Sequence, residues 1–102
     1  MRIALVGGVE RNETTLQRLA ESHGHRLDYH GGHMKGRGVD EMDRFVSRAD
    51  VVIVSTDVNS HTAVMYARKA ARRLNRELIL VRNCNPTRFS ELLTELEARK
   101  AA

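Results

Sequence analysis

Short apolar runs and stretches with apolar residues at helical spacing take turns along the chain. Largely continuous apolar runs at residues 3–6, 51–55 and 78–81 are typical of parallel strands buried on both faces. Residues 26–30 instead alternate polar and apolar side chains, which is typical of a strand at a sheet edge. The pattern therefore predicts four strands, with residues 51–55, the most hydrophobic of them, at the centre of the sheet.

Each predicted strand is followed by a segment with the periodicity of an amphipathic helix. The apolar positions of these segments are Leu16, Leu19 and Ala20; Val39, Met42, Phe45 and Val46; Ala63, Val64, Ala67, Ala71 and Leu74; and Phe89, Leu92, Leu93 and Leu96. Asn12, Ser60 and Asn85 can cap helix N-termini, and Pro86 suits a first helical position. Gly24 stands where a left-handed C-terminal cap is expected.

Four strands alternating with four helices predict an α/β fold in a single domain over residues 1–102. Right-handed crossovers with one change of direction give a four-stranded parallel sheet of order 2-1-3-4 with helices on both faces. This is a three-layer Rossmann-like or flavodoxin-like architecture. Ligands of such sheets bind beyond the carboxyl ends of the strands, where the strand order changes direction. We call the loops at these ends the carboxyl rim; the switch point lies between the loops after the first and third strands.

The composition is that of an ordinary globular chain and limits the compartment. The chain has 102 residues, of which 41% are hydrophobic and 29% charged, unlike a disordered or fibrous protein. Its apolar runs are far shorter than the about 20 residues that cross a membrane, and no signal peptide is evident. Cys84 is the only cysteine, so no internal disulfide can form, which fits a reducing cytoplasm.

The chain is basic, but only modestly so. It carries 17 Lys and Arg against 13 Asp and Glu, and its 2 Tyr and 2 Phe are too few for a base-stacking platform. The predicted outer face of the third helix gathers Arg68, Lys69, Arg72, Arg73 and Arg76. These side chains can bind phosphate backbones, although a solvated helix face explains them as well. A nucleic-acid-binding module through Arg68–Arg76 is therefore an alternative function that the sequence does not favour.

The carboxyl rim gathers glycines, histidines and polar residues. The residues expected to bind a ligand there are Gly7, Gly8, His30, Gly31, Gly32, His33, Lys35, Arg37, Thr56, Asp57, Asn59, Ser60 and His61. Glycine allows a ligand to approach backbone amides closely, although it also simply turns the chain. The glycines of residues 31–38 favour a loop that closes over a ligand. His23 and His25 instead flank a helix end, where we expect them to be solvated or to interact with the helix dipole.

A transition metal or haem is one class of ligand that the rim residues fit. His30, His33, His61 and Cys84 are of the types that bind zinc, iron or copper and that serve as axial ligands of haem. Their spacing matches no established metal signature, such as paired C-x-x-C or H-E-x-x-H. The metal site is therefore a hypothesis based on residue type and predicted topology.

A small anion, a nucleotide or another phosphate-containing ligand is the other class. The N-termini of the first and third helices would point free amides at a negative group. Lys35 and Arg37 can supply positive charge, and Asp57 or Asn59 can hold a ribose or sugar hydroxyl. Ser60 is expected to cap the third helix whether or not an anion binds there.

The function that these observations favour is a non-enzymatic ligand-binding module with a sensory or regulatory role. The alternative is a small enzyme with acid–base or redox chemistry, in which His61 is the acid/base and Asp57 orients it, but no nucleophile or cofactor motif supports this. Residues 78–81 are apolar on both faces and, as a bare edge strand, predict a homodimer.

Several short segments together resemble a family of bacterial proteins. They are Val6-Gly7-Gly8, Tyr29-His30-Gly31-Gly32, Arg48-Ala49-Asp50-Val51-Val52-Ile53 and Thr56-Asp57-x-x-Ser60-His61. The family is known as domain of unknown function 2325, and the resemblance runs from Met1 to about Phe89. It implies a Rossmann-like domain with no assigned reaction, and a site formed by His30, His33, Asp57, Ser60 and His61. Tyr29 stands where the family typically has a first histidine, and Val58 or Asn59 where it has a cysteine.

Overall fold

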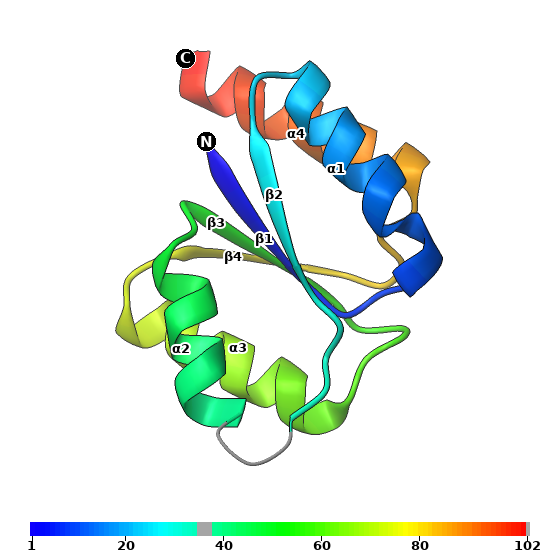
Figure 1. Ribbon diagram of the computed structural model, residues 1–102. Coiled ribbons are helices and arrows are strands. Elements are labelled where there is room, and N and C mark those ends of the chain that lie inside the picture. The colour runs from blue at the N-terminus through cyan, green and yellow to red at the C-terminus, as the bar shows by residue number, and fades with distance from the viewer. Residues whose placement is uncertain (35–37, 102) are drawn as a thin grey trace.

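A computed structural model shows one parallel sheet between two layers of helices (Figure 1). The structure describes residues 1–34 and 38–101. The strands are β1 (Arg2–Val6), β2 (Arg26–His30), β3 (Val51–Ser55) and β4 (Glu77–Val81). Their order is β2-β1-β3-β4 and every neighbouring pair is parallel, which confirms the predicted topology.

The helices lie on both faces of the sheet, as the α/β prediction requires. They are α1 (Glu13–Ser22), which follows the short 3-10 helix η1 (Glu10–Asn12), α2 (Gly38–Ser47), α3 (His61–Arg73) and α4 (Pro86–Ala101). In Figure 1, α1 and α4 cover one face and α2 and α3 the other. Within the described residues, no helix is both long and apolar enough to span a membrane.

Two hydrophobic clusters, one on each face, hold the layers together. Ile3 and Ile53 pack against α1 and α4, where Phe89 is fully buried. The alternate residues Ala4 and Val52 pack against α2 and α3. Because β1 and β3 contribute to both clusters, their carboxyl ends are fixed in space, and these ends form the switch point of the rim.

The helix caps and the buried helix faces follow the sequence signals closely, with two exceptions. The Ser60 hydroxyl accepts from the Ala63 amide at 3.0 Å and the Asn85 side chain from the Arg88 amide at 2.8 Å, so both predicted caps are present. Asn12 occupies the predicted N-cap of α1, but its side chain makes no capping hydrogen bond. Val39, expected on the buried face of α2, is 43% exposed.

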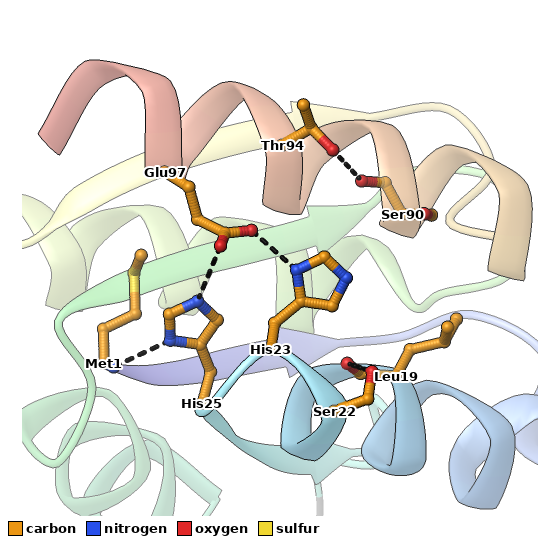
Figure 2. Close-up of polar contacts among 8 residues, drawn as sticks. All are labelled: Met1, Leu19, Ser22, His23, His25, Ser90, Thr94 and Glu97. Carbon is orange, nitrogen blue, oxygen red and sulfur yellow. Dashed lines mark hydrogen bonds and ion pairs between the residues drawn. The ribbon is translucent and has the colours of Figure 1, made fainter. Parts of the chain in front are cut away.

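His23 and His25 make specific contacts at the amino end of the sheet, opposite the rim (Figure 2). His23 Nδ1 lies 2.7 Å from Glu97 Oε1 of α4, and His25 Nδ1 lies 3.0 Å from the amino group of Met1. His25 Nε2 is also 3.9 Å from Glu97 Oε2. The expectation that these residues are solvated is therefore wrong, because they connect the α1–β2 turn to α4. His23 is also the C-cap residue of α1, as the position at a helix end predicted.

Strand β4 forms one edge of the sheet, as predicted. It pairs with β3 on one side, and Leu80 in its outer half is 46% exposed. The edge on which the homodimer prediction depends is therefore present. The presence of this edge does not say what pairs with it, and the homodimer stays a prediction.

Candidate functional site

Asn59 bridges the carboxyl ends of the two central strands. Its Nδ2 donates to the backbone oxygens of Val6, at the end of β1, and Ser55, at the end of β3, at 3.2 and 2.8 Å. Its Oδ1 accepts from the Ser60 amide at 2.9 Å. We call these three hydrogen bonds the Asn59 bridge. The Asn59 side chain, which the sequence suggested could hold a ligand hydroxyl, is therefore engaged within the chain itself.

Two of the rim glycines make room for this bridge. Gly7 and Gly32 have φ angles of +82° and +87°, and a Cβ at either position would overlap the Asn59 side chain. L-residues with a side chain rarely adopt such angles. These glycines therefore have a structural role, because the lack of a side chain allows Asn59 to approach their backbone closely.

The amides of the glycine loops are largely engaged within the chain. The Gly7 amide donates to the His30 oxygen at 2.8 Å, and the Gly8 amide donates to the Val58 oxygen at 2.6 Å. The Gly32 amide donates to His30 Nδ1 at 3.0 Å. These donors tie the loops after β1, β2 and β3 to one another. They are therefore not free to bind an anion as a glycine-rich phosphate loop does.

Ser60 joins α3 to the loop after β2. Besides capping α3, its hydroxyl donates to the Gly32 oxygen at 2.8 Å. The Ser60 hydroxyl thus accepts from one backbone group of the chain and donates to another. The rim is a preformed, braced structure in which Asn59 and Ser60 have positioning roles.

A cavity of about 250 Å³ opens at the switch point, and we call it the rim cavity. It is lined by Gly8, Val9, Glu10, Tyr29, Gly31, His33 and Val58. Gly8, Gly31 and His33 were predicted from the sequence as ligand-binding residues. Glu10 was expected only to lie on the rim, and Val9, Tyr29 and Val58 were not predicted to bind a ligand. Alternation along β2 places Tyr29 on the face opposite His30, and that signal could have identified it.

Tyr29 brings a neutral hydroxyl to the rim cavity. Its Oη donates to the Gly8 oxygen at 3.2 Å. Burial, followed by the nearby carboxylates of Glu10 and Glu13, raises the pKa of the phenol above its usual value. The side chain therefore remains an uncharged hydrogen-bonding group at neutral pH, beside the imidazole of His33 and the carboxylate of Glu10.

Two buried polar atoms at the rim have no hydrogen-bond partner within the described part of the chain. They are Ser55 Oγ, in a residue 1% exposed, and His30 Nε2, in a residue 8% exposed. Such atoms are uncommon in native proteins, and an unseen water or ligand is a usual reason for them. Ser55 Oγ would lie 3.9 Å from a Cβ built on Gly8, a residue that lines the rim cavity, but Ser55 itself is not among the lining residues.

His30 faces the other side of the sheet, against α2. Its ring meets Phe45 edge-on, with 5.4 Å between the ring centroids. Burial lowers the pKa of the imidazole, and Glu41 opposes this effect. In the neutral form Nδ1 accepts from the Gly32 amide, so Nε2 carries the proton.

The loop after β3 does not form the predicted acid–base arrangement. Thr56, Asp57 and His61 are all exposed, and Thr56 donates from its amide and hydroxyl to the Val81 oxygen. Among the described residues, no hydrogen bond or ion pair joins Asp57 to His61, and His61 lines a groove along α3 rather than the rim cavity. The observations thus give the alternative enzyme mechanism no support.

The four residues considered for a metal are not brought together. Cys84 is buried in the cluster under α1 and α4, whereas His30 faces α2 and His61 lines the α3 groove. Within residues 1–34 and 38–101 no three His, Cys, Asp or Glu side chains are grouped to hold a metal ion. Lys35 and Arg37, proposed to supply positive charge, lie outside the described residues.

Cys84 is expected to react slowly with thiol reagents in the native protein. Burial raises the pKa of its thiol from 9.0 to about 11, which lowers the thiolate fraction near pH 8 about a hundredfold. Labelling with an aromatic disulfide at pH 8 should therefore be slow in buffer and fast in concentrated urea. Rapid stoichiometric labelling of the native protein would contradict the buried placement.

Comparison with known proteins gives this α/β domain a family. Residues 2–96 match the model of a family described as "Uncharacterized protein conserved in bacteria (DUF2325)". The chain belongs to this family. The match extends from β1 into α4 and includes all four rim loops, which confirms the family resemblance noted in the sequence.

Two curated relatives are similar to this DUF2325 chain over most of its length. Each is a "UPF0751 protein", from Desulfitobacterium hafniense strains DSM 10664 / DCB-2 and Y51. Each is 29% identical over 83 residues, which cover 80% of this chain and 81% of the relative. These names carry no activity, so any function must be argued from the site itself.

Proposed function

We propose that the protein is a non-enzymatic, cytoplasmic ligand-binding module with a sensory or regulatory role, whose ligand occupies the rim cavity. The observation that carries the proposal is this preformed cavity of about 250 Å³ at the switch point of the sheet. The unpartnered hydroxyl of Ser55, in a residue only 1% exposed, lies close to Gly8, a lining residue of the cavity. A ligand or an ordered water that reaches this hydroxyl would satisfy it.

The ligand class that fits best is a small anion that also carries a hydroxyl or amino group. The cavity is smaller than the roughly 300–1,000 Å³ of sites that enclose drug-sized molecules, so a haem does not fit inside it. His33 can donate to an anion, and Glu10 can accept from a hydroxyl or ammonium group. A sugar phosphate or the phosphate end of a nucleotide has this combination of groups.

A regulatory role is favoured over catalysis by the state of the polar groups. The Asn59 bridge and Ser60 are engaged in hydrogen bonds within the chain, and Asp57 and His61 form no pair in the described structure. Catalysis needs a nucleophile or an acid–base pair held near the reacting atoms. A lone buried thiol at Cys84 also fits the reducing cytoplasm.

His33→Ala is expected to weaken binding at the rim cavity by about tenfold, the equivalent of 1.4 kcal/mol. The probes are inorganic phosphate, ribose 5-phosphate and AMP, screened by thermal shift and then titrated by calorimetry. Thr15→Ala, an exposed change on α1, is the matched control and should bind as the wild type does.

Two results would contradict this proposal. One is an unchanged affinity of the best probe for His33→Ala. The other is a visible absorption band or stoichiometric zinc, iron or copper in protein purified without a histidine tag. The second result would instead support the metal or haem hypothesis.

A further inference from the structure

A second surface, independent of the rim cavity, lies along the exposed side of α3 beside β4. It contains a groove of about 450 Å³, which we call the α3 groove. The groove is lined by His61, Val64, Met65, Arg68, Lys69, Arg72 and Leu78. It shares no lining residue with the rim cavity. Its chemistry is both apolar and cationic, and the proposed rim ligand does not explain it.

The cations of the groove have no acidic partner in the part of the chain that the structure describes. Arg68, Lys69 and Arg72 form no ion pair there, and the sequence of α3 contains no acidic residue. The next arginines along the chain differ, because Arg73 pairs with Asp43 and Arg76 donates to the Ser47 oxygen at 3.1 Å. The unpaired charges are therefore confined to the side of α3 that faces the groove.

Exposed apolar side chains lie at the same place. Met65 and Leu80 are 37% and 46% exposed, and Leu78 lines the groove. Alternation along β4 puts Leu78 and Leu80 on one face of the strand, and Leu78 packs against the cluster of α2 and α3. This face of β4 therefore continues the apolar floor of the α3 groove to the sheet edge.

Among the described residues β4 pairs only with β3, so its backbone is unpaired there on its outer side. Native proteins often protect such edges with inward-pointing or flanking charges. The opposite edge, β2, follows this rule, since Asp28 pairs with Arg2 and Arg26. Strand β4 carries one such charge at its start, where Glu77 pairs with Arg99 of α4, but its central residues from Leu78 to Leu80 are apolar.

We propose that β4 and the α3 groove dock an extended acidic segment of a partner protein. The segment adds to β4 as a fifth strand, with its backbone bonding to the free edge. An apolar side chain of the segment covers Met65 and Leu80, while acidic side chains meet Arg68, Lys69 and Arg72. One occupant thus satisfies the unpaired backbone, the exposed apolar groups and the unpaired cations together.

Charge argues against a second copy of the chain as the occupant. Two-fold pairing of β4 with β4 would place the two α3 helices side by side, on the same face of the joined sheet. The cations Arg68, Lys69 and Arg72 of each copy would then approach those of the other, and α3 carries no carboxylate to compensate. Like charges brought together across an interface cost several kcal/mol.

A nucleic acid explains the surface less completely. Phosphates would neutralise the cations of α3, but they would leave Leu80, Met65 and the free edge of β4 exposed. The acidic segment is therefore the occupant that the observations favour, and the two others are distinguishable outcomes of its test.

The test measures binding of a dye-labelled eight-residue peptide with three glutamates followed by alternating valine and threonine. Fluorescence anisotropy should show saturable binding to the full chain, and the same peptide with lysines in place of glutamates should not bind. The double variant Arg68→Ala/Arg72→Ala should weaken binding at least tenfold, and Leu80→Ser about threefold. The matched control Arg11→Ala/Arg18→Ala removes two exposed cations of η1 and α1 and should change binding less than twofold.

Three results would overturn the proposal. Equal loss of peptide binding in both double variants would show non-specific attraction. Tighter binding of single- or double-stranded DNA, lost in Arg68→Ala/Arg72→Ala, would assign the surface to nucleic acid. A dimer in light scattering that Leu80→Ser dissociates would assign the edge to a second copy. Because Leu80 is exposed, the variants should fold, and a His33→Ala variant should still bind the peptide, which keeps this test separate from that of the rim cavity.

Discussion

Asn59→Ala is expected to lower the free energy of unfolding by about 1–3 kcal/mol, because it removes two hydrogen bonds to backbone oxygens at the ends of the central strands. The side chain donates to the oxygens of Val6 and Ser55, both in buried residues at the ends of the central strands. Each lost hydrogen bond is worth about 0.5–1.5 kcal/mol, whereas the exposed Ser60 amide can bond to water instead. Urea unfolding followed by circular dichroism measures the change.

The Asn59→Asp variant tests the contribution of the Nδ2 donor by itself. Asn59→Asp keeps an oxygen for the Ser60 amide but loses the Nδ2 donor, and it sets a carboxylate against two carbonyls. It should therefore be at least as unstable as Asn59→Ala. If the free energy of unfolding of Asn59→Ala or Asn59→Asp lay within about 0.5 kcal/mol of the wild-type value, it would contradict the bracing role of the Asn59 bridge.

Gly32 gives an independent test of the same contact. Gly32→Ala is expected to destabilise through backbone strain at φ +87° and through overlap of the new methyl with Asn59. Gly24→Ala is the matched control for strain alone, because Gly24 has φ +78° and nothing lies within 4 Å of its Cβ position. In an Asn59→Ala background the overlap at Gly32 is absent. A double-mutant cycle should therefore show a coupling of about 1–2 kcal/mol, and strict additivity would contradict the packing.

The fold was predictable because its determinants are local. Residues 3–6 and 51–55 are apolar without alternation, and only a strand covered on both faces buries every side chain of such a run. The pairing of β1 with β3, and the edge positions of β2 and β4, follow from crossover handedness and this contrast in pattern. The loop after β1 was less predictable, since no pattern distinguished its 3-10 turn from the first turn of α1.

The candidate site was predictable as a location but not as a set of contacts. Topology places Gly7, Gly32 and Asn59 on one rim, but it does not say that two glycines meet the third residue's side chain. Residue type suggested that the glycine amides and the Asn59 amide face a ligand. The structure uses them within the chain, because loops that converge on a rim must also satisfy their own backbone groups.

Side-chain direction explains the residues that residue type alone misplaced. Cys84 lies in the rim loop that follows β4, but its side chain is buried in the core under α1 and α4. His61 begins α3 and faces the groove on that helix. A loop has no periodicity from which such directions can be predicted, and this is why the metal hypothesis could group residues that lie on different faces of the sheet.

His30 is expected to make the protein less stable as the pH falls below about 6.5. Burial lowers the pKa of its imidazole in the folded state from the ordinary value of 6.5, so the unfolded chain binds more protons in this window. Stability from this residue is therefore fully present above pH 6.5, and it decreases as the pH falls from there through the folded-state value. Protonation would also place an Nδ1–H against the Gly32 amide, which now donates to that nitrogen.

The groups that act on His30 define the control for this expectation. Glu41 of α2 favours the protonated ring and His33 opposes it, but burial has the larger effect. Urea unfolding between pH 7.5 and 5.5 should show that His30→Gln flattens the fall in stability, whereas His33→Gln, at an exposed imidazole, should largely retain it. An unchanged pH dependence in His30→Gln would mean that the ring is protonated as readily in the folded chain as in water.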